Sequence, residues 1–453
     1  MLDGMPQNMT AAEAQADGAD RISALPDGIL RHVLEFLEAD EAVRTSLLAR
    51  RWNGLWRFMR TLRITRSGTT ISSCRNLVDH LLNLCGHSTL DACFFSFTYG
   101  DNVSLLKDDS LSKDDVNCLN RWTRYALLQE VQLLSVDVQR PREDTLLLSF
   151  LNNLRLVSQS LIKLQLVGVD LQSNSLDFSR CLALKELNLT KCDIIDDTDN
   201  IYSPSLACLR FHECGFLEER RVRISTPNLI SLEMTGCSGS TPIFEYMPAL
   251  VTAIVIFNHK SEDRCYNGDP GYCADDSCAW CYGIDDGSAG CVLLGGLSAA
   301  TNLKLLSAPQ VFLIRRDLRF CPTFSKLKTL LLNGWCVVGE QCAVACILQH
   351  SPVLEELTID LYTEQLDDEL PEIINKQIVP SKAIYNYSME QSLTMENLNK
   401  VEVKCHEVNQ WVFDVTRSLI TYGIPLHKIS IEQKSRPSEC LNFVCVGFRS
   451  SQN

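Results

Sequence analysis

The pattern L-x-x-L-x-L recurs at a nearly constant interval, and this feature constrains the fold of the chain more than any other. Four copies start 23, 22 and 23 residues apart, at Leu161, Leu184, Leu206 and Leu229. The last three copies each carry a cysteine eight residues after the first leucine, at Cys192, Cys214 and Cys237. Side chains two residues apart on a strand point to the same face, so the last two apolar positions of each copy should face one interior. No copy can bury its apolar edge alone, and the copies must therefore stack.

A period of this length with this signature is typical of leucine-rich repeats, in which each coil packs only against its neighbours. An ordinary sheet with leucine-rich strands is the alternative. The shared cysteine, whose small thiol fits the tight turn behind a strand, argues against it. Less regular copies follow, beginning at Leu250, Leu303, Leu327, Leu354, Leu398 and Leu426. We therefore predict an α/β fold in which parallel strands line a curved, irregular and interrupted solenoid.

Charge and cysteine content narrow the functional classes. The 453-residue chain has a formal net charge of −14 and no prominent basic run, which makes nucleic acid a poor candidate partner. No segment approaches the roughly 18 apolar residues of a membrane span, and the polar N-terminus lacks the features of a signal peptide. The 21 cysteines are spread along the chain, unlike those of a small disulfide scaffold. We expect a soluble protein of the nucleus, the cytoplasm or both, with no membrane partner.

The segment 20–60 is predicted to form a compact helical module. Pro26 suits a first helical turn because it lacks an N–H, and Asp27 places negative charge at the positive end of the helix dipole. We expect a second helix over 41–48 with Asp40 as its N-cap, and a third around Trp52. Helical spacing predicts an apolar face made of Ile29, Leu30, Val33, Leu34 and Leu37. About 40 residues cannot bury this much apolar surface. The face covers either a partner or the following repeats, and physics alone leaves both open.

The same segment resembles an F-box of the plant type. The resemblance rests on three elements: Leu25-Pro26, the apolar ladder over 29–37, and the run over 50–56. Ala49, where animal F-boxes usually carry cysteine, and the Asn53-Gly54 pair depart from the pattern without removing an anchor. From the resemblance we expect contacts with a Skp-type adaptor through Leu25, Pro26, Ile29, Leu30, Val33, Leu37, Val43, Leu47, Trp52 and Leu55.

The chain from about residue 20 to 433 resembles the grass-type plant F-box proteins with leucine-rich repeats. Its end is similar to the FBD domain that closes many of these chains. We divide the chain into a disordered tail (1–19), the F-box (20–60), a linker with first repeat-like units (61–150), the repeats (151–350) with a cysteine-rich insert (260–291), an FBD-like region (351–433) and a C-terminal tail (434–453).

The family resemblance implies a role without catalysis. Such proteins are substrate receptors of SCF-type cullin–RING ubiquitin ligases, in which the F-box binds the adaptor and the repeats hold a protein substrate. We therefore expect no catalytic residue and no cofactor. The eight histidines form no H-E-x-x-H or H-x3-H pattern, and no phosphate-binding glycine loop is present. Two alternatives stay open: a repeat scaffold that no longer recruits a ligase, and a co-receptor that needs a small ligand to hold its target.

Residues between the strand leucines should line the concave face of the array, where a substrate would bind. The candidates are Lys163, Gln165, Glu186, Asn188, Arg210, His212, Glu233, Glu356 and Asp360. In the insert, Cys278 and Cys281 have the Cys-x2-Cys spacing of a zinc-binding pair. A second standard pair is missing, so an acidic loop with free thiols is the alternative there.

Overall fold

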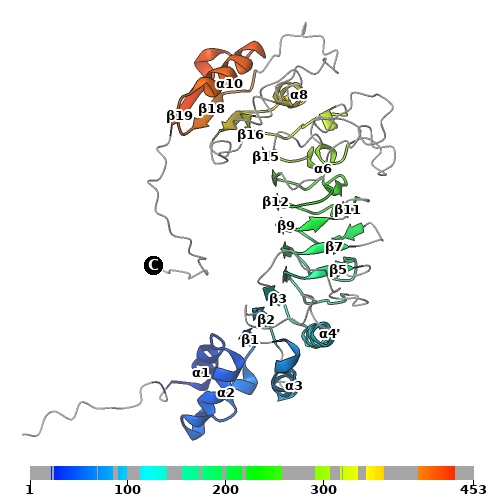
Figure 1. The fold of residues 1–453 in the computed structure, drawn as a ribbon, viewed down its shortest axis with the longest axis vertical. Helices are drawn as coiled ribbons and strands as arrows, with labels where there is room; N and C mark the ends of the chain where they lie inside the picture. Colours follow the sequence, from blue (N-terminus) through cyan, green and yellow to red (C-terminus); the bar gives the residue numbers. More distant parts are fainter. Residues whose placement is uncertain are drawn as a thin grey trace, which may run out of the picture.

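One long parallel sheet runs through the molecule, which this computed structural model shows as a curved stack of coils (Figure 1). The sheet has 13 strands in the order β1-β2-β3-β4-β6-β9-β12-β14-β15-β16-β17-β18-β19, so the strands follow one another along the chain. The structure describes residues 22, 25–68, 70–84, 90–98, 113–139, 156–172, 176–195, 200–216, 221–257, 291–306, 317–318, 320–334, 343–361 and 396–433.

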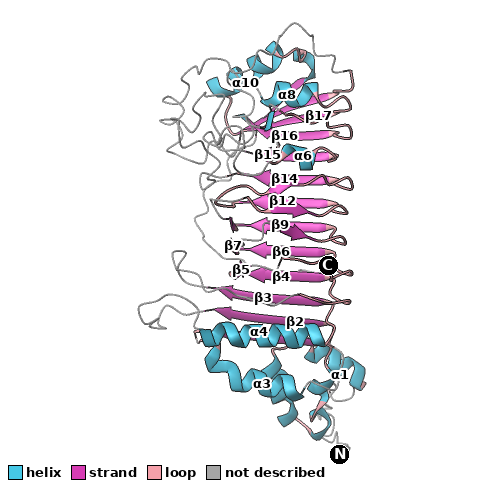
Figure 2. Cartoon of the chain, turned by 90° about the vertical axis from the view of Figure 1, so that its right-hand side faces the viewer, coloured by secondary structure: helices cyan, strands magenta, loops and turns pink. Residues whose placement is uncertain are grey.

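The strands of the main sheet are short and evenly stacked (Figure 2). Their bounds are β1 Thr61–Ser67, β2 Ala92–Thr98, β3 Leu133–Gln139, β4 Lys163–Val167, β6 Glu186–Thr190, β9 Cys208–His212, β12 Ser231–Thr235, β14 Thr252–Ile256, β15 Asn302–Leu306, β16 Thr329–Asn333, β17 Glu356–Asp360, β18 Lys400–Cys405 and β19 Ile429–Gln433. The leucines of successive copies lie directly opposite one another: Leu164 pairs with Leu187, and Leu187 with Leu209. All three are buried. The predicted α/β solenoid of parallel strands is confirmed, and β1 to β3 extend it into the segment that precedes the first regular copy.

A left-handed residue ends each regular strand and turns the chain into the next side of the coil. Gly168, Lys191, Glu213 and Gly236 all have φ between 50° and 67°. The amides of Gly168, Lys191 and Glu213 join neighbouring coils, as where Lys191 N–H donates to His212 O at 2.8 Å. The cysteines predicted at this turn follow immediately. Cys192 and Cys214 are fully buried, and the Cys214 thiol donates to Leu189 O at 3.3 Å.

Substituting Gly168 with alanine is expected to destabilise the first regular coil. The left-handed backbone alone costs an L-residue about 1–2 kcal/mol, and here a new Cβ would also clash with the backbone carbonyl of Val138 on β3. Gly236→Ala is the matched control: its φ is +67°, but the nearest neighbour of a Cβ would be the Glu213 side chain at 3.2 Å. The urea concentration at the unfolding midpoint should be highest for the wild type, lower for Gly236→Ala and lowest for Gly168→Ala. Equal midpoints for the two variants would contradict this prediction.

The side of the coils away from the main sheet changes along the array. Regular coils carry two small parallel sheets there, and other coils carry helices (Figure 2). The strands are β5 Asp170–Gln172, β7 Asp193–Ile195 and β10 Gly215–Phe216 in one sheet, and β8 Asn200–Tyr202, β11 Arg223–Ser225 and β13 Ile243–Phe244 in the other. The helices are α3 Arg75–Leu84, α4 Lys113–Leu128, α6 Leu294–Leu297, α8 Ala343–Gln349 and α10 Gln410–Thr421. The long helix α4 comes directly before β3 in the chain, and its Leu119 and Trp122 side chains are fully buried.

The N-terminal module is helical, with two differences from expectation. Its elements are α1 Asp27–Leu34, α2 Ala39–Arg44 and the 3-10 turns η1 Thr45–Leu47, η2 Arg50–Trp52 and η3 Leu55–Phe58. The second helix starts earlier than predicted, with Glu38 at the N-cap position and Asp40 in the first turn. The expected third helix is two short turns because Gly54 between them adopts φ +83°, a conformation that glycine enters without strain.

Several expectations concern parts of the chain outside the described residues. They are the tails at 1–19 and 434–453, the Cys278/Cys281 pair with almost all of the insert 260–291, and the centre of the FBD-like region. Within the described ranges, no helix combines the length and apolar character needed to cross a membrane.

Candidate protein-docking surfaces

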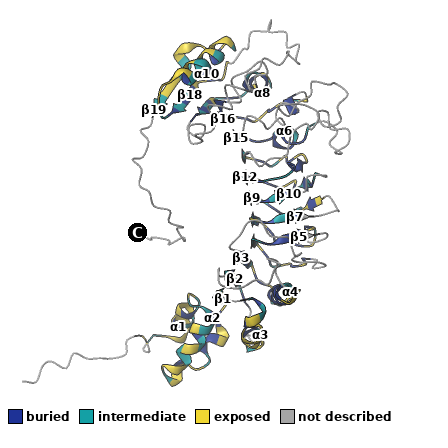
Figure 3. Ribbon diagram, in the orientation of Figure 1, coloured by how far each residue is buried: buried dark blue, intermediate teal, exposed yellow. Residues whose placement is uncertain are grey.

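The residues predicted to contact an adaptor separate into an exposed and a buried group. Pro26, Ile29 and Val33 are exposed on or beside α1, and Leu47 on η1 is 88% exposed. Leu25, Leu37 and Val43 are half-buried against the core. An apolar surface of this kind is expensive to leave in water, and such patches commonly mark protein interfaces. The exposed colouring of this module contrasts with the buried strands of the array (Figure 3).

Leu30, Trp52 and Leu55 are not at the surface, which corrects their prediction as direct contacts. Leu30 has an exposed fraction of 0%, and Trp52 and Leu55 are also buried in the core of the module. For Leu30 the reason is helix phase: positions 30 and 34 of α1 share a face turned inward, while positions 29 and 33 share the neighbouring face that remains open. These three side chains therefore hold the module together and do not offer surface to a partner.

Four exposed apolar side chains of the module escaped the sequence prediction. They are Phe36, which is 70% exposed, together with Ile22, Leu48 and Phe58. Phe36 lies seven residues after Ile29, so the i, i+4, i+7 spacing of the open helix face could have identified it. Neighbouring side chains contact the two aromatic rings. The His32 ring packs edge-on against the Phe36 ring, with the ring centroids 5.2 Å apart. The Arg31 guanidinium lies 6.0 Å from the centroid of the Phe58 ring.

Polar contacts fix this surface to the solenoid. Arg51 donates to Leu25 O and, at 2.8 Å, to Asp27 Oδ1, which fastens η2 to the start of α1. Glu38 accepts two hydrogen bonds from Thr65 on β1, from its backbone N–H at 2.9 Å and its hydroxyl at 3.0 Å. Glu35 similarly accepts from the Arg60 backbone N–H at 3.0 Å. The helical module is therefore joined directly to the first strand of the sheet.

The candidate substrate residues on the regular coils form a continuous polar ladder. The Lys163 Nζ and Glu186 Oε2 atoms are 3.0 Å apart across β4 and β6. Arg210 on β9 donates to Asn188 Oδ1 at 3.1 Å and lies 3.4 Å from Glu233 Oε2 on β12. The structure thus brings together the predicted residues of β4 to β12, including Gln165 and His212 in the same outward register. Their role in substrate binding stays a prediction.

Glu356 and Asp360 belong to a separate charged group near the C-terminal end of the sheet. The intervening strands present Ile254, Lys304 and Leu331 in the corresponding central row. Beyond them, Glu356 and Asp360 lie opposite Lys400 and Lys404 of β18. The outward face is therefore densely charged at both ends, and between them the apolar Ile254 and Leu331 flank a single lysine, Lys304, in this row.

The charges at the C-terminal end stabilise one another. Glu402 lies 3.1 Å from Lys400 Nζ and 3.3 Å from Lys404 Nζ, and Lys404 also pairs with Glu432 at 3.2 Å. Slight burial alone would raise the pKa of Glu402, but the two lysines outweigh it and lower the pKa below its usual value. The carboxylate is therefore held ionised, as part of a network that joins β18 and β19.

Comparisons with known proteins agree with this architecture. An F-box domain model matches residues 22–63. An F-box/LRR-repeat protein of Arabidopsis thaliana is 29% identical over 254 residues, which are 48% of this chain and 40% of that relative. An F-box/FBD/LRR-repeat protein of the same plant is 42% identical over 76 residues, 16% of each chain. A probable FBD-associated F-box protein of Arabidopsis thaliana is 23% identical over 296 residues, which are 64% of this chain and 61% of that relative.

These matches cover the curated relatives incompletely. The aligned parts span 40%, 16% and 61% of the three Arabidopsis proteins above. They span 23% of a further relative, a putative F-box/LRR-repeat protein of the same plant. The F-box match includes α1, α2 and the 3-10 turns and extends to β1. The apolar surface on α1 and η1 thus lies inside the matched domain.

Proposed function

We propose that this chain, a plant-type F-box protein with leucine-rich repeats, is the substrate-receptor subunit of an SCF-type cullin–RING ubiquitin ligase. The observation that carries the proposal is the apolar surface of Ile29, Val33, Phe36 and Leu47 within the matched F-box. Nothing else among the described residues of this module buries it. A Skp-type adaptor is the partner that an F-box binds, and through it the chain would reach the cullin.

The expected strength of this contact follows from its apolar area. Fully burying one large aliphatic or aromatic side chain contributes roughly 1.5–3 kcal/mol before the cost of association. Several such side chains on one rigid module are enough for a stable complex. Leu30, Trp52 and Leu55 would act indirectly, because their packing inside the module sets the positions of α1 and η1.

The role requires no catalytic group in this chain. A receptor that holds its substrate near the ubiquitin-conjugating enzyme increases the effective concentration of the reacting lysine, and this proximity supplies the rate gain. The protein is in this view a non-catalytic subunit, and it needs no cofactor. We place it in the nucleus, the cytoplasm or both.

The substrate would lie on the outward face of the sheet. The ladder from Lys163 to Glu233 presents both signs of charge, and Ile254 and Leu331 provide apolar contact area beside it. A mixed surface of this kind suits a protein partner, since charged rims select the partner and apolar centres provide affinity. The segment 396–433, containing β18, α10 and β19, would be the FBD-like end of this surface.

The double substitution Ile29→Glu/Val33→Glu is expected to weaken binding of a purified plant Skp-type adaptor by at least about 100-fold, because it replaces two buried apolar contacts with unpaired charges. Both side chains are exposed in the free chain, so the variant should keep its fold and its melting temperature. Isothermal titration calorimetry on the full-length proteins measures the affinity.

A matched control uses two exposed apolar side chains of the repeats. Ile230→Glu/Val251→Glu changes the same residue types at positions of similar exposure, on neighbouring coils linked by the Val251 N–H to Ile230 O hydrogen bond. This variant should bind the adaptor as the wild type does. If the Ile29/Val33 variant binds the adaptor with wild-type affinity, the assignment of the α1 surface as the adaptor contact is wrong. A wild-type chain that binds no Skp-type adaptor would instead favour the scaffold alternative.

A further inference from the structure

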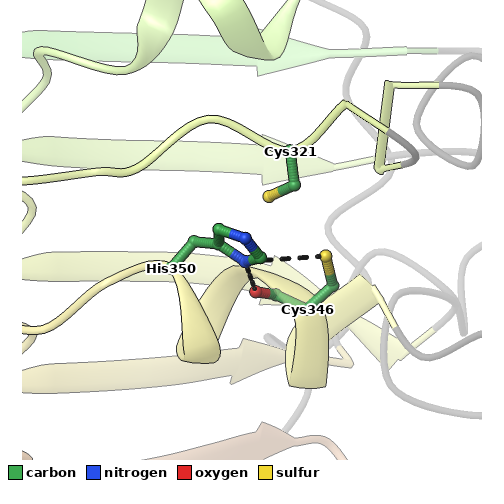
Figure 4. A group of neighbouring side chains, drawn as sticks. All are labelled: Cys321, Cys346 and His350. Carbon is green, nitrogen blue, oxygen red and sulfur yellow. Dashed lines mark hydrogen bonds between the residues drawn. The ribbon is translucent and has the colours of Figure 1, made fainter. Parts of the chain in front are cut away.

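Two cysteines and a histidine from different coils meet near the C-terminal part of the array. Cys346 lies on α8, His350 directly follows that helix, and Cys321 lies in the segment that precedes β16 (Figure 4). Their nearest sulfur and ring nitrogen atoms all lie within 4.8 Å of one another. The Cys346 side chain is buried, and the other two are half-buried. This group plays no part in the docking surfaces described above.

The local sequence explains why Cys346 and His350 face the same point. Residues four apart on a helix lie on one face, one turn above the other. The Cys346 Sγ and His350 Nδ1 atoms are accordingly 4.0 Å apart. Stacking of the coils then brings Cys321 against this face, although it is distant in sequence, and Figure 4 shows its sulfur turned toward the imidazole.

A hydrogen bond sets the orientation and tautomer of the histidine. The Nδ1 atom lies 2.9 Å from the backbone carbonyl of Cys346, and since a carbonyl oxygen can only accept, Nδ1 carries the proton. In the neutral ring Nε2 is then unprotonated and has a lone pair for a ligand. Histidines that bind metals typically donate their other ring N–H to a backbone carbonyl in this way.

We propose that Cys321, Cys346 and His350 bind one Zn²⁺ ion. Thiolates and a neutral imidazole are the ligands that zinc prefers, and three protein ligands leave one tetrahedral position for water or a further group. With Zn–S near 2.3 Å and Zn–N near 2.0–2.1 Å, tetrahedral ligand atoms lie about 3.4–3.8 Å apart. The observed separations of up to 4.8 Å therefore need to close by about 1 Å, through rotation of the half-buried Cys321 side chain. The Cys346 thiol must also turn toward Nε2, because its 4.0 Å contact is with Nδ1.

Binding would join two consecutive coils. Cys321 belongs to the coil that leads into β16, whereas Cys346 and His350 belong to the coil that leads into β17. Two thiols each lose a proton to solvent as the metal–sulfur bonds form, and no electron transfer is involved. The two thiolates neutralise the charge of the ion. Bound zinc would therefore hold α8 against the preceding coil and stabilise the C-terminal part of the array.

The test measures zinc in the full-length protein, purified under reducing conditions and exposed to equimolar Zn²⁺ before gel filtration. We expect about one zinc per chain by mass spectrometry of the metal in the wild type. His350→Ala and Cys346→Ser should each lower the zinc content at least about fivefold. Two controls should keep it: Cys405→Ser, which changes a buried cysteine of β18, and Cys278→Ser/Cys281→Ser, which removes the Cys-x2-Cys pair of the insert.

A second measurement uses only the wild-type chain and so does not depend on how the variants fold. Replacing zinc with Co²⁺ should produce the intense visible bands of a tetrahedral site together with sulfur-to-metal charge transfer in the near ultraviolet. A wild type that retains no zinc, or a weak six-coordinate cobalt spectrum, overturns the proposal. So does loss of zinc in the Cys278/Cys281 variant with retention in Cys346→Ser. A Cys321–Cys346 disulfide found by peptide mapping of the protein as purified from cells overturns it as well.

Discussion

Replacing Asp317 with alanine is expected to lower the free energy of unfolding by about 3–5 kcal/mol. The carboxylate has an exposed fraction of 0%. It accepts hydrogen bonds from three consecutive backbone N–H groups, those of Val292 at 2.8 Å, Leu293 at 2.6 Å and Leu294 at 2.8 Å. Alanine would leave these amides buried without an acceptor, and each such group costs about 1–3 kcal/mol.

Asp317→Asn provides the graded comparison. Asparagine keeps one acceptor oxygen at nearly the same size, so it should lose roughly half as much stability as alanine. Asp360→Ala changes an acidic residue on the outward face of β17 and should stay within about 0.5 kcal/mol of the wild type. Urea unfolding followed by far-ultraviolet circular dichroism measures all three. An Asp317→Ala midpoint equal to that of Asp360→Ala would show that the amides find other partners.

Asp317 also illustrates what sequence pattern could not predict. Its partners lie 23 to 25 residues earlier in the chain, at the start of α6. A capping residue is normally recognised because it directly precedes its helix. Here the cap comes from the next coil, and no local signal marks an aspartate as the acceptor. Contacts of this kind form only when successive coils stack. Asp317 lies in the irregular part of the array, where no constant repeat interval indicates which residues of two coils will be neighbours.

The strands of the array were predictable because their apolar positions are fixed by two local periods. The two-residue alternation places Leu164 and Leu166 inward, and the interval of 22 or 23 residues places each next pair beside the last. The turn after each strand was predictable only in part. The cysteine was identified, whereas the left-handed residue before it was not, since Lys191 and Glu213 occupy it without glycine.

Adaptor binding through the F-box stays a prediction, and the structure shows only which of the predicted side chains are exposed. Sequence spacing showed that α1 has an apolar side, but Ile29 and Leu30 are adjacent in sequence and both fit it. Which of them faces the core depends on how η3 packs against the helix, and that packing depends on Gly54. The zinc-binding proposal has a similar origin: Cys346 and His350 show helical spacing in sequence, but only the fold brings Cys321 to them.

Replacing Trp122 with alanine is expected to destabilise the N-terminal end of the solenoid by about 3–5 kcal/mol, the usual cost of removing a buried tryptophan. The side chain is fully buried on α4, and its ring stacks on Phe97 of β2 with centroids 5.7 Å apart. Its indole N–H donates to Asp79 Oδ1 on α3 at 2.9 Å. One residue thus connects two helices and the second strand.

This position matters because a repeat array must close its ends. An end coil has no neighbour to cover its apolar core, so a capping structure is required. Here α3 and α4 lie beside β1 and β2 (Figure 1), and β1 carries Thr65, whose backbone N–H donates to Glu38 of the F-box. Loss of Trp122 should therefore loosen the junction between the adaptor-binding module and the repeats as well as the core.

The comparison of Trp122→Phe with Trp122→Ala separates these contributions. Phenylalanine keeps an aromatic ring on Phe97 but removes the donor to Asp79, which retains its ion pair with Arg121, so the expected loss is about 1–2 kcal/mol. Phe413→Ala, at an exposed aromatic side chain on α10, should change stability by less than about 0.5 kcal/mol. Hydrogen exchange should show faster exchange in β1 and β2 of Trp122→Ala and unchanged protection in β12 and β14, because coils in a solenoid support mainly their neighbours. Uniformly increased exchange along the whole sheet would mean that the array unfolds as one unit and that the end helices do not act as a local cap.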